Sequence, residues 1–247
     1  MVQNFEGIIS DIVKADYRAA DVFKKYSINF CCSGLIPLRD ACNLKEIDYD
    51  LVTRDLEMAT QPYYLPEMVH VGAWRLDFLI DYIINIHHAS GIRSAVSLTE
   101  IMHSFLQGHR KKYPELEGLD TIFLQLSALN EQHNAYEEEV IFPYIRQIDR
   151  AHRNMESYGE LLVRTLRKPL TTASQGHDVI DILLEQMKSV TNNFMFPQKA
   201  CTNHQVLFHK LRAFYNNMVQ HHFLEKLFLF PKAIEIERQL MGESNFR

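Results

Sequence analysis

The chain has 247 residues, with a hydrophobic content of 47% and a charged content of 23%, as in soluble globular proteins with a full core. Its net charge of −5 and the lack of a large basic block argue against a nucleic-acid partner. The sequence contains no run of about 18 apolar residues, so we expect no membrane span. The four cysteines do not resemble a secreted disulfide framework, and the first residues do not resemble a signal peptide, so we expect a cytoplasmic protein.

The first 60 residues are expected to form a small helical domain. Apolar residues recur there at helical spacing in short segments, the first of which contains Ile8, Ile9, Ile12 and Val13. About 60 residues form only a modest core, so we expect this domain to dock on the rest of the chain or to form a homodimer. Pro62 and Pro66 then indicate a linker over residues 61–72.

Long helices are expected from residue 73 onward. Apolar spacing predicts four of them, over residues 74–107, 121–148, 174–191 and 203–230, the last with a tail to 238. Four long helices with short connections are typical of a bundle whose functional side chains point inward. We therefore predict an all-α protein with a four-helix bundle over residues 73–247. Residues 150–167 are extra length, expected to be helical, without an assigned role.

One pattern in the bundle region occurs twice. It reads H-x3-E-x3-[IL]-F-P, and its two copies begin at His133 and His221 and end at Pro143 and Pro231. Residues four apart share one face of a helix, so each copy presents an imidazole and a carboxylate together. A further histidine precedes each copy at nearly the same distance. The pattern predicts two helical hairpins that bring their imidazoles and carboxylates to a shared centre.

The neighbours of the first motif indicate that its face is buried. The apolar or aromatic residues predicted on the face of His133 are Leu126, Leu129, Tyr136 and Val140. A lone His-x3-Glu on a helix is usually a surface ion pair, but two matching copies weaken that interpretation. A carboxylate and an imidazole on an apolar face are costly unless they are paired or bind a metal.

The predicted metal ligands are His88, His133, Glu137, His177, His221 and Glu225. Terminal imidazoles and bridging carboxylates suit two iron ions, with an oxo or hydroxo bridge and open positions for O2 or NO. A structural zinc site usually has four ligands that include thiolates. A ferritin-type site needs Glu-x-x-His on two helices, whereas both copies of that spacing, which end at His70 and His103, lie on or just before one helix.

Several histidines compete for these positions. His221 is preferred to His222 because Glu225 follows it by four residues, whereas a lysine follows His222 at that spacing. The choice of His88 over His87 rests on the repeat spacing and on the family register given below. The remaining histidines are expected outside the centre: His70, His103, His109, His152, His204 and His209.

Cys31 and Cys32 are the candidates for a catalytic role. Adjacent cysteines form only a strained disulfide, so one interpretation is a pair of small, half-buried residues at a turn before Gly34. A redox or metal-handling role would need exposed thiols of low pKa. Cys42 and Cys201 are expected to be structural or remain unassigned.

Two segments and the doubled motif carry a family resemblance. Residues 17–26, YRAADVFKKY, and 29–34, NFCCSG, resemble the N-terminal domain of ScdA-type proteins, and the doubled motif resembles hemerythrin-like domains. Together they are similar to the repair-of-iron-centres family of di-iron proteins over nearly the whole chain. The family's iron ligands fall on the six residues predicted above. Residues 176–178, GHD, fall on the family's Glu-His-Asp. The departures are Ser33 in place of a glycine and the longer insertion at 150–167.

The resemblance implies a stress-response protein that repairs iron–sulfur clusters damaged by nitric oxide or oxidants, with iron donation as the expected mechanism. Its partners would be damaged or apo iron–sulfur proteins and the diatomic ligands NO and O2. One alternative is an enzyme that reduces NO at the di-iron centre. Another is an O2 or iron sensor of hemerythrin type. The N-terminal cysteines favour the first two functions, because an oxygen carrier does not need them.

Overall fold

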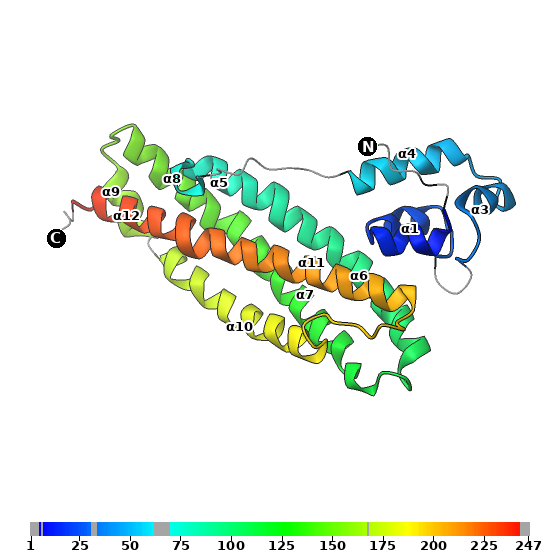
Figure 1. The fold of residues 1–247 in the computed structure, drawn as a ribbon. Coiled ribbons are helices and arrows are strands. Elements are labelled where there is room, and N and C mark those ends of the chain that lie inside the picture. The colour runs from blue at the N-terminus through cyan, green and yellow to red at the C-terminus, as the bar shows by residue number, and fades with distance from the viewer. Residues whose placement is uncertain (1–4, 6, 31–33, 62–69, 167, 243–247) are drawn as a thin grey trace. The chain divides into compact units, whose positions relative to one another are not determined.

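Amphipathic helical segments make up most of the protein, as the apolar spacing of the sequence indicates. The computed structural model describes residues 5, 7–30, 34–61, 70–166 and 168–242, and the side chains within these ranges except those of 166–175. No strand occurs within these ranges, and the predicted all-α helical bundle is confirmed (Figure 1). None of the helices described there is long and apolar enough to cross a membrane.

The chain divides into two units. Unit 1 comprises Met1–Glu67, Ser97–Glu117 and Thr191–Ala213. Unit 2 comprises Met68–Val96, Gly118–Val190 and Phe214–Arg247. The long helices α6 (Ala89–His109) and α11 (Thr202–Leu224) contribute residues to both units. The domain boundaries at residues 60 and 73 stay a prediction.

Four short helices build most of unit 1. They are α1 (Ile9–Ala15), α2 (Ala19–Lys25), α3 (Leu38–Leu44) and α4 (Tyr49–Thr60). Their apolar faces enclose Phe23 and Leu56, which are fully buried, and Val206 of α11 packs into the same core. The Nζ atom of Lys210 lies 2.5 Å from Asp21 Oδ2, so a charge pair also joins α11 to α2 within this unit.

Unit 2 holds the remaining helices. They are α5 (Leu76–Tyr82), α7 (Leu119–Tyr136), α8 (Phe142–Arg153), α9 (Gly159–Leu166), α10 (Lys168–Val190) and α12 (Phe230–Leu240), with the 3-10 turn η1 (Val71–Ala73). A second 3-10 turn, η3 (Pro114–Leu116), belongs to unit 1. Helix α10 packs against α7, and α8 packs against α12 and α5. Phe123 and Phe214 meet edge to face with ring centroids 5.3 Å apart. This core surrounds the polar residues described below.

Three π-helical turns interrupt the long helices of unit 2. They are η2 (Ile83–His88), η4 (Glu137–Ile141) and η5 (Glu225–Leu229). In the second turn the Phe142 N–H donates to the carbonyl of Glu137, five residues back. Pro143 and Pro231 follow in the first turn of α8 and α12, where a missing N–H costs no helical hydrogen bond. Such turns often mark functional sites.

The helices that contain the motif prolines continue past them, as the predicted bounds require. They end at Arg153 in α8 and at Leu240 in α12, beyond the predicted ends at 148 and 238. The side chains around the first motif also face differently from the prediction. Ile141 is fully buried, whereas Val140 and Tyr136 are 37% and 41% exposed, so the predicted burial of these two residues is wrong.

The extra segment between the second and third predicted helices is helical. It contains the end of α8 and the short helix α9, whose Val163 is fully buried in the core of unit 2. The third predicted helix begins earlier than expected, at Lys168. The insertion therefore extends the hydrophobic core of this unit.

The aromatic pair in unit 2 generates a stability prediction. Phe123→Ala should lower the free energy of unfolding by about 3–5 kcal/mol, because it removes a fully buried ring and leaves a cavity. Leu124→Ala is the matched control, since the neighbouring side chain is 53% exposed and should change stability by only about 0.5 kcal/mol. Urea denaturation followed by circular dichroism measures both, and equal losses would contradict this packing.

Candidate metal centre

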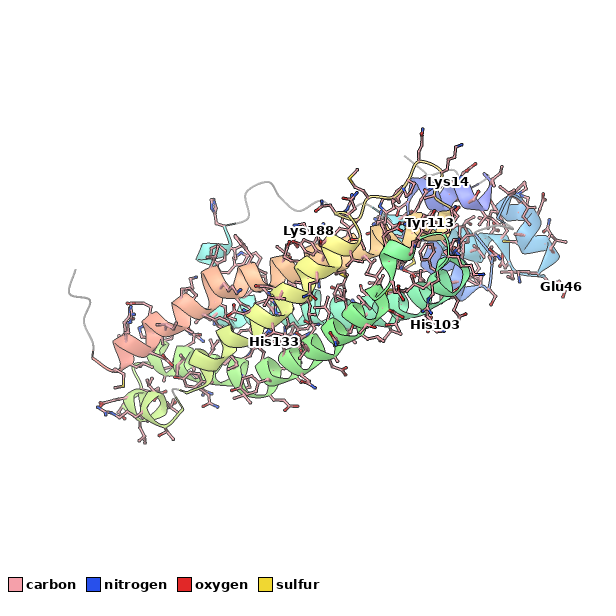
Figure 2. The ribbon with its side chains drawn as sticks, turned by 90° about the horizontal axis from the view of Figure 1, so that it is seen from below. Lys14, Glu46, His103, Tyr113, His133 and Lys188 are labelled. Carbon is pink, nitrogen blue, oxygen red and sulfur yellow. The ribbon has the colours of Figure 1, made fainter. Side chains whose placement is uncertain are left out.

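Six buried polar side chains of unit 2 meet inside its helices. They are His88 at the end of η2, His133 on α7, Glu137 at the start of η4, His177 on α10, His221 on α11 and Glu225 at the start of η5. His133 is labelled in Figure 2, on the helix that packs against α10. The structure thus brings together all six residues that the sequence analysis selected.

The four imidazoles form two pairs. In the first pair, the Nε2 atoms of His88 and His221 lie 3.1 Å apart. In the second pair, the Nε2 atoms of His133 and His177 also lie 3.1 Å apart. Donor atoms of either pair and of both glutamates lie within 4.8 Å of one another. Each pair therefore has the spacing needed to share one cation with the carboxylates.

Each carboxylate lies between the two pairs. Glu137 has Oε2 3.4 Å from Nε2 of His88 in the first pair and Oε1 3.2 Å from Nε2 of His133 in the second. Glu225 Oε1 lies 3.0 Å from Nε2 of His221 in the first pair, and its Oε2 lies 3.0 Å from Nε2 of His177 in the second. One oxygen toward each pair is the arrangement that a carboxylate needs to bridge two cations.

The carboxylates lack ordinary hydrogen-bond partners. Glu137 and Glu225 are fully buried, and none of their four oxygens accepts a hydrogen bond from the residues described. An ionised carboxylate in such surroundings is strongly destabilising unless a proton or a cation neutralises it. Imidazole nitrogens and carboxylate oxygens together suit a divalent transition metal. This group of residues can therefore hold metal ions.

The charged groups of the centre shift one another's pKa values. Burial alone would lower the pKa of His221, but the negative charges of Glu225 and Glu137 outweigh burial and raise the pKa to about 10. Burial likewise opposes protonation of His177, yet the two glutamates raise its pKa. The pKa of Glu137 lies well below its ordinary value because the surrounding imidazoles outweigh the effect of burial. Protons and metal ions therefore compete for the same nitrogen atoms.

A second carboxylate fixes the orientation of His88. Glu138 Oε1 lies 2.7 Å from His88 Nδ1. An ionised carboxylate only accepts, so Nδ1 carries the proton and the lone pair of Nε2 faces His221 and Glu137. The sequence analysis missed Glu138, because its contact joins two helices that are far apart in the chain. Its position directly after Glu137 was the available signal.

The two neighbouring histidines set aside in the sequence analysis are also buried. His87 Nδ1 lies 2.8 Å from the amide oxygen of Asn217. His222 Nδ1 lies 2.6 Å from Asp181 Oδ1, and burial lowers the pKa of His222 to about 4. One donor atom of His222 also lies within 4.8 Å of those of the second pair. The spacing of four residues does not reveal the role of His222, because its partner Asp181 is on α10.

The other candidate residues lie elsewhere or outside the described residues. His109 belongs to unit 1, where its Nδ1 lies 3.0 Å from the carbonyl oxygen of Phe105 and its Nε2 lies 3.6 Å from Cys201 Sγ. Cys31 and Cys32 fall among residues that the structure does not describe, so their redox role stays a prediction.

A small cavity adjoins the second imidazole pair. Its volume is about 270 Å³, and it is lined by Leu129, Gln132, His133, Tyr136, Gly176, Val179 and Ile180. Gly176 lies against His133, because a Cβ atom at this glycine would be 3.0 Å from His133 Nδ1. The absence of a side chain at this position therefore leaves His133 room beside the cavity.

Comparisons with known proteins agree with the resemblance seen in the sequence. The family ScdA_N, described as "Domain of Unknown function (DUF542)", matches residues 6–60. A protein named "Iron-sulfur cluster repair protein YtfE" from Escherichia coli O81 (strain ED1a) is 28% identical over 221 residues, which are 88% of this chain and 91% of that protein. The protein of the same name from Escherichia fergusonii (strain ATCC 35469) matches equally well. The predicted resemblance is thereby confirmed.

The contact at Gly176 generates a prediction about metal affinity. Gly176→Ala should weaken metal binding on the order of tenfold, because the new methyl group would displace the His133 ring. Stability without metal should not fall, since alanine favours a helix by about 1 kcal/mol over glycine. Cobalt(II) titration measures the affinity. Gly108→Ala is the control, because its added Cβ would meet nothing within 4 Å beyond its own stretch of helix backbone. Equal affinities in both variants would refute the contact.

The raised histidine pKa values predict a proton release. At about pH 8, above the ordinary value of 6.5 but below about 10, His221 carries a proton in the metal-free centre. A metal ion must displace that proton, so binding should release protons and become tighter as the pH rises toward 10. Isothermal titration calorimetry in buffers with different ionisation enthalpies measures the release. Binding without proton release would contradict these pKa shifts.

Proposed function

We propose that this protein carries a di-iron centre and repairs iron–sulfur clusters damaged by nitric oxide or oxidants. One observation carries the proposal: two buried carboxylates without hydrogen-bond donors each turn one oxygen toward each of two imidazole pairs. The name of the similar proteins, iron–sulfur cluster repair protein, supports the same function. Because the sequence identity to these proteins is only 28%, the arrangement of the six buried residues supports the proposal more strongly than the shared sequence does.

The proposed iron ligands are the first pair, the second pair and both bridging glutamates. Bound iron would supply open coordination positions for small molecules and a change of oxidation state. The protein residues contribute burial, which excludes water from the centre, and hydrogen bonds that hold the imidazoles in place. Glu138 keeps the proton of His88 on Nδ1, which leaves Nε2 free to bind.

Iron donation is the mechanism that this donor set supports best. All six donors are nitrogen or oxygen atoms, and ferrous iron lies low in the affinity order of divalent metals for such ligands. The raised pKa values of His177 and His221 add competition from protons, which weakens metal binding as the pH falls. An iron ion held in this way can be transferred to an apo iron–sulfur protein.

The wider context of the proposal follows from the sequence. We place the protein in the cytoplasm as a stress-response factor whose clients are damaged or apo iron–sulfur proteins. Its domains would be an ScdA-type N-terminal domain over residues 1–60, a linker over 61–72 and the hemerythrin-like bundle over 73–247. Cys31 and Cys32 would supply a redox function.

Reduction of NO is the second candidate function. Two adjacent iron ions with open positions could bind two NO molecules, and the cavity beside His133 offers space for small ligands. Anaerobic addition of NO to the reduced protein distinguishes the candidates. Consumption of NO with N2O as product supports the reductase, whereas iron transfer to an apo-cluster protein without NO consumption supports donation. Reversible O2 binding without either activity would support a sensor.

The bridging glutamates generate the test of the centre. Glu137→Ala or Glu225→Ala should reduce the iron content well below two ions per chain and abolish repair, because four imidazoles would lose a bridging anion. Elemental analysis of the purified variants measures iron per chain. Glu139→Ala is the matched control, since this glutamate is exposed two residues after Glu137 and should leave the iron content unchanged. Two ions retained in both glutamate variants would refute the assignment.

A further inference from the structure

His222 is a buried imidazole with one nitrogen unused. Its side chain is 4% exposed, and its Nδ1 lies 2.6 Å from Asp181 Oδ1. Its Nε2 is buried and has no hydrogen-bond partner among the residues described. A buried nitrogen without a partner costs free energy, so its surroundings should contain something that it can bind.

Asp181 determines which nitrogen of His222 is free. The carboxylate can only accept, so the proton of the neutral ring lies on Nδ1 and the lone pair lies on Nε2. Lys226 Nζ lies 2.8 Å from the other oxygen of Asp181 and stabilises its negative charge. Carboxylate, imidazole and metal occur in this order in many metal sites, where the carboxylate orients the ligand.

The free imidazole lies beside the second pair. The ring of His222 stacks on that of His177 with centroids 4.1 Å apart and an interplanar angle of 25°. The centroid of His133 is 6.0 Å away, with its ring nearly perpendicular to that of His222. One donor atom of each of these three histidines lies within 4.8 Å of the others. The three imidazoles therefore have donor atoms spaced closely enough to hold one cation, in a group separate from the two groups that contain Glu137 and Glu225.

The first pair has no such neighbour. His87 is adjacent to His88 in the chain and is also buried. Among the described residues, however, its ring nitrogens do not join any cluster of three or more possible metal ligands. Its Nδ1 faces the amide oxygen of Asn217 rather than a carboxylate. The surroundings of the two pairs are therefore chemically different.

We infer that Nε2 of His222 is a further ligand of the metal ion held by His133 and His177, and that Asp181 is its positioning residue. The inference rests on the proposed metal centre and goes beyond its six expected ligands. The ion at the second pair would have three imidazoles, and the ion at the first pair two. The second ion is then held more tightly, and the first ion is the first to be donated.

Metal titration of the full-length, metal-free protein tests this asymmetry. Fe(II) under anaerobic conditions and Co(II) serve as probes, with absorption spectra recorded at each addition. Wild-type protein should bind two ions in two steps of different affinity. His222→Leu should weaken the tighter step at least about tenfold and change the Co(II) spectrum, because one nitrogen ligand is lost. Asp181→Asn should weaken the same step about 10- to 100-fold.

His87→Leu is the matched control, because it removes a buried imidazole next to the other pair and should leave the tighter step and its spectrum unchanged. If His222→Leu binds two ions with the same affinities and the same Co(II) spectrum as wild type, the inference is overturned and the proposed function stays intact. Failure of wild type to bind two ions would overturn the proposed function itself. If His222→Leu does not fold without metal, as judged by circular dichroism, an unchanged tighter step in Asp181→Asn overturns the inference.

Discussion

Glu137 and Glu225 are fully buried in helices that otherwise meet through apolar side chains, and no donor among the described residues satisfies their oxygens. Ionised carboxylates in such a place require positive charge nearby, so the four imidazoles around them are as much a condition of folding as of function. Histidine protons would meet this condition in the absence of metal, and metal ions would meet it by displacing those protons. The same electrostatic demand thus links stability, pH and metal binding.

The backbone adapts locally to deliver these side chains. A π-turn begins at each bridging glutamate, and a third π-turn ends at His88. Each turn inserts a residue into the helix, which changes the direction of the side chains that follow. The prolines of the doubled motif sit directly after two of these turns, where they cost no helical hydrogen bond. The conformational cost is concentrated at the candidate metal centre, as is common for π-turns at functional sites.

The residues behind the imidazoles distinguish the two halves of an otherwise symmetric centre. A carboxylate orients His88 in the first pair, whereas in the second pair Asp181 orients the additional imidazole of His222. Such hydrogen bonds decide which nitrogen is available to a metal. A centre with one firmly held and one more labile ion would suit a protein that donates iron and yet keeps its fold.

The sequence by itself determined the helical class and, through the doubled spacing of four residues, which imidazole and carboxylate share a helix face. Those relations lie within one helix and follow from its constant geometry. Only the tertiary structure decided that Tyr136 is exposed and that His222 faces Asp181. Both depend on how each helix is rotated against its neighbours, which apolar spacing within one helix does not reveal. Contacts between helices are therefore set by packing, which no single segment of the sequence encodes.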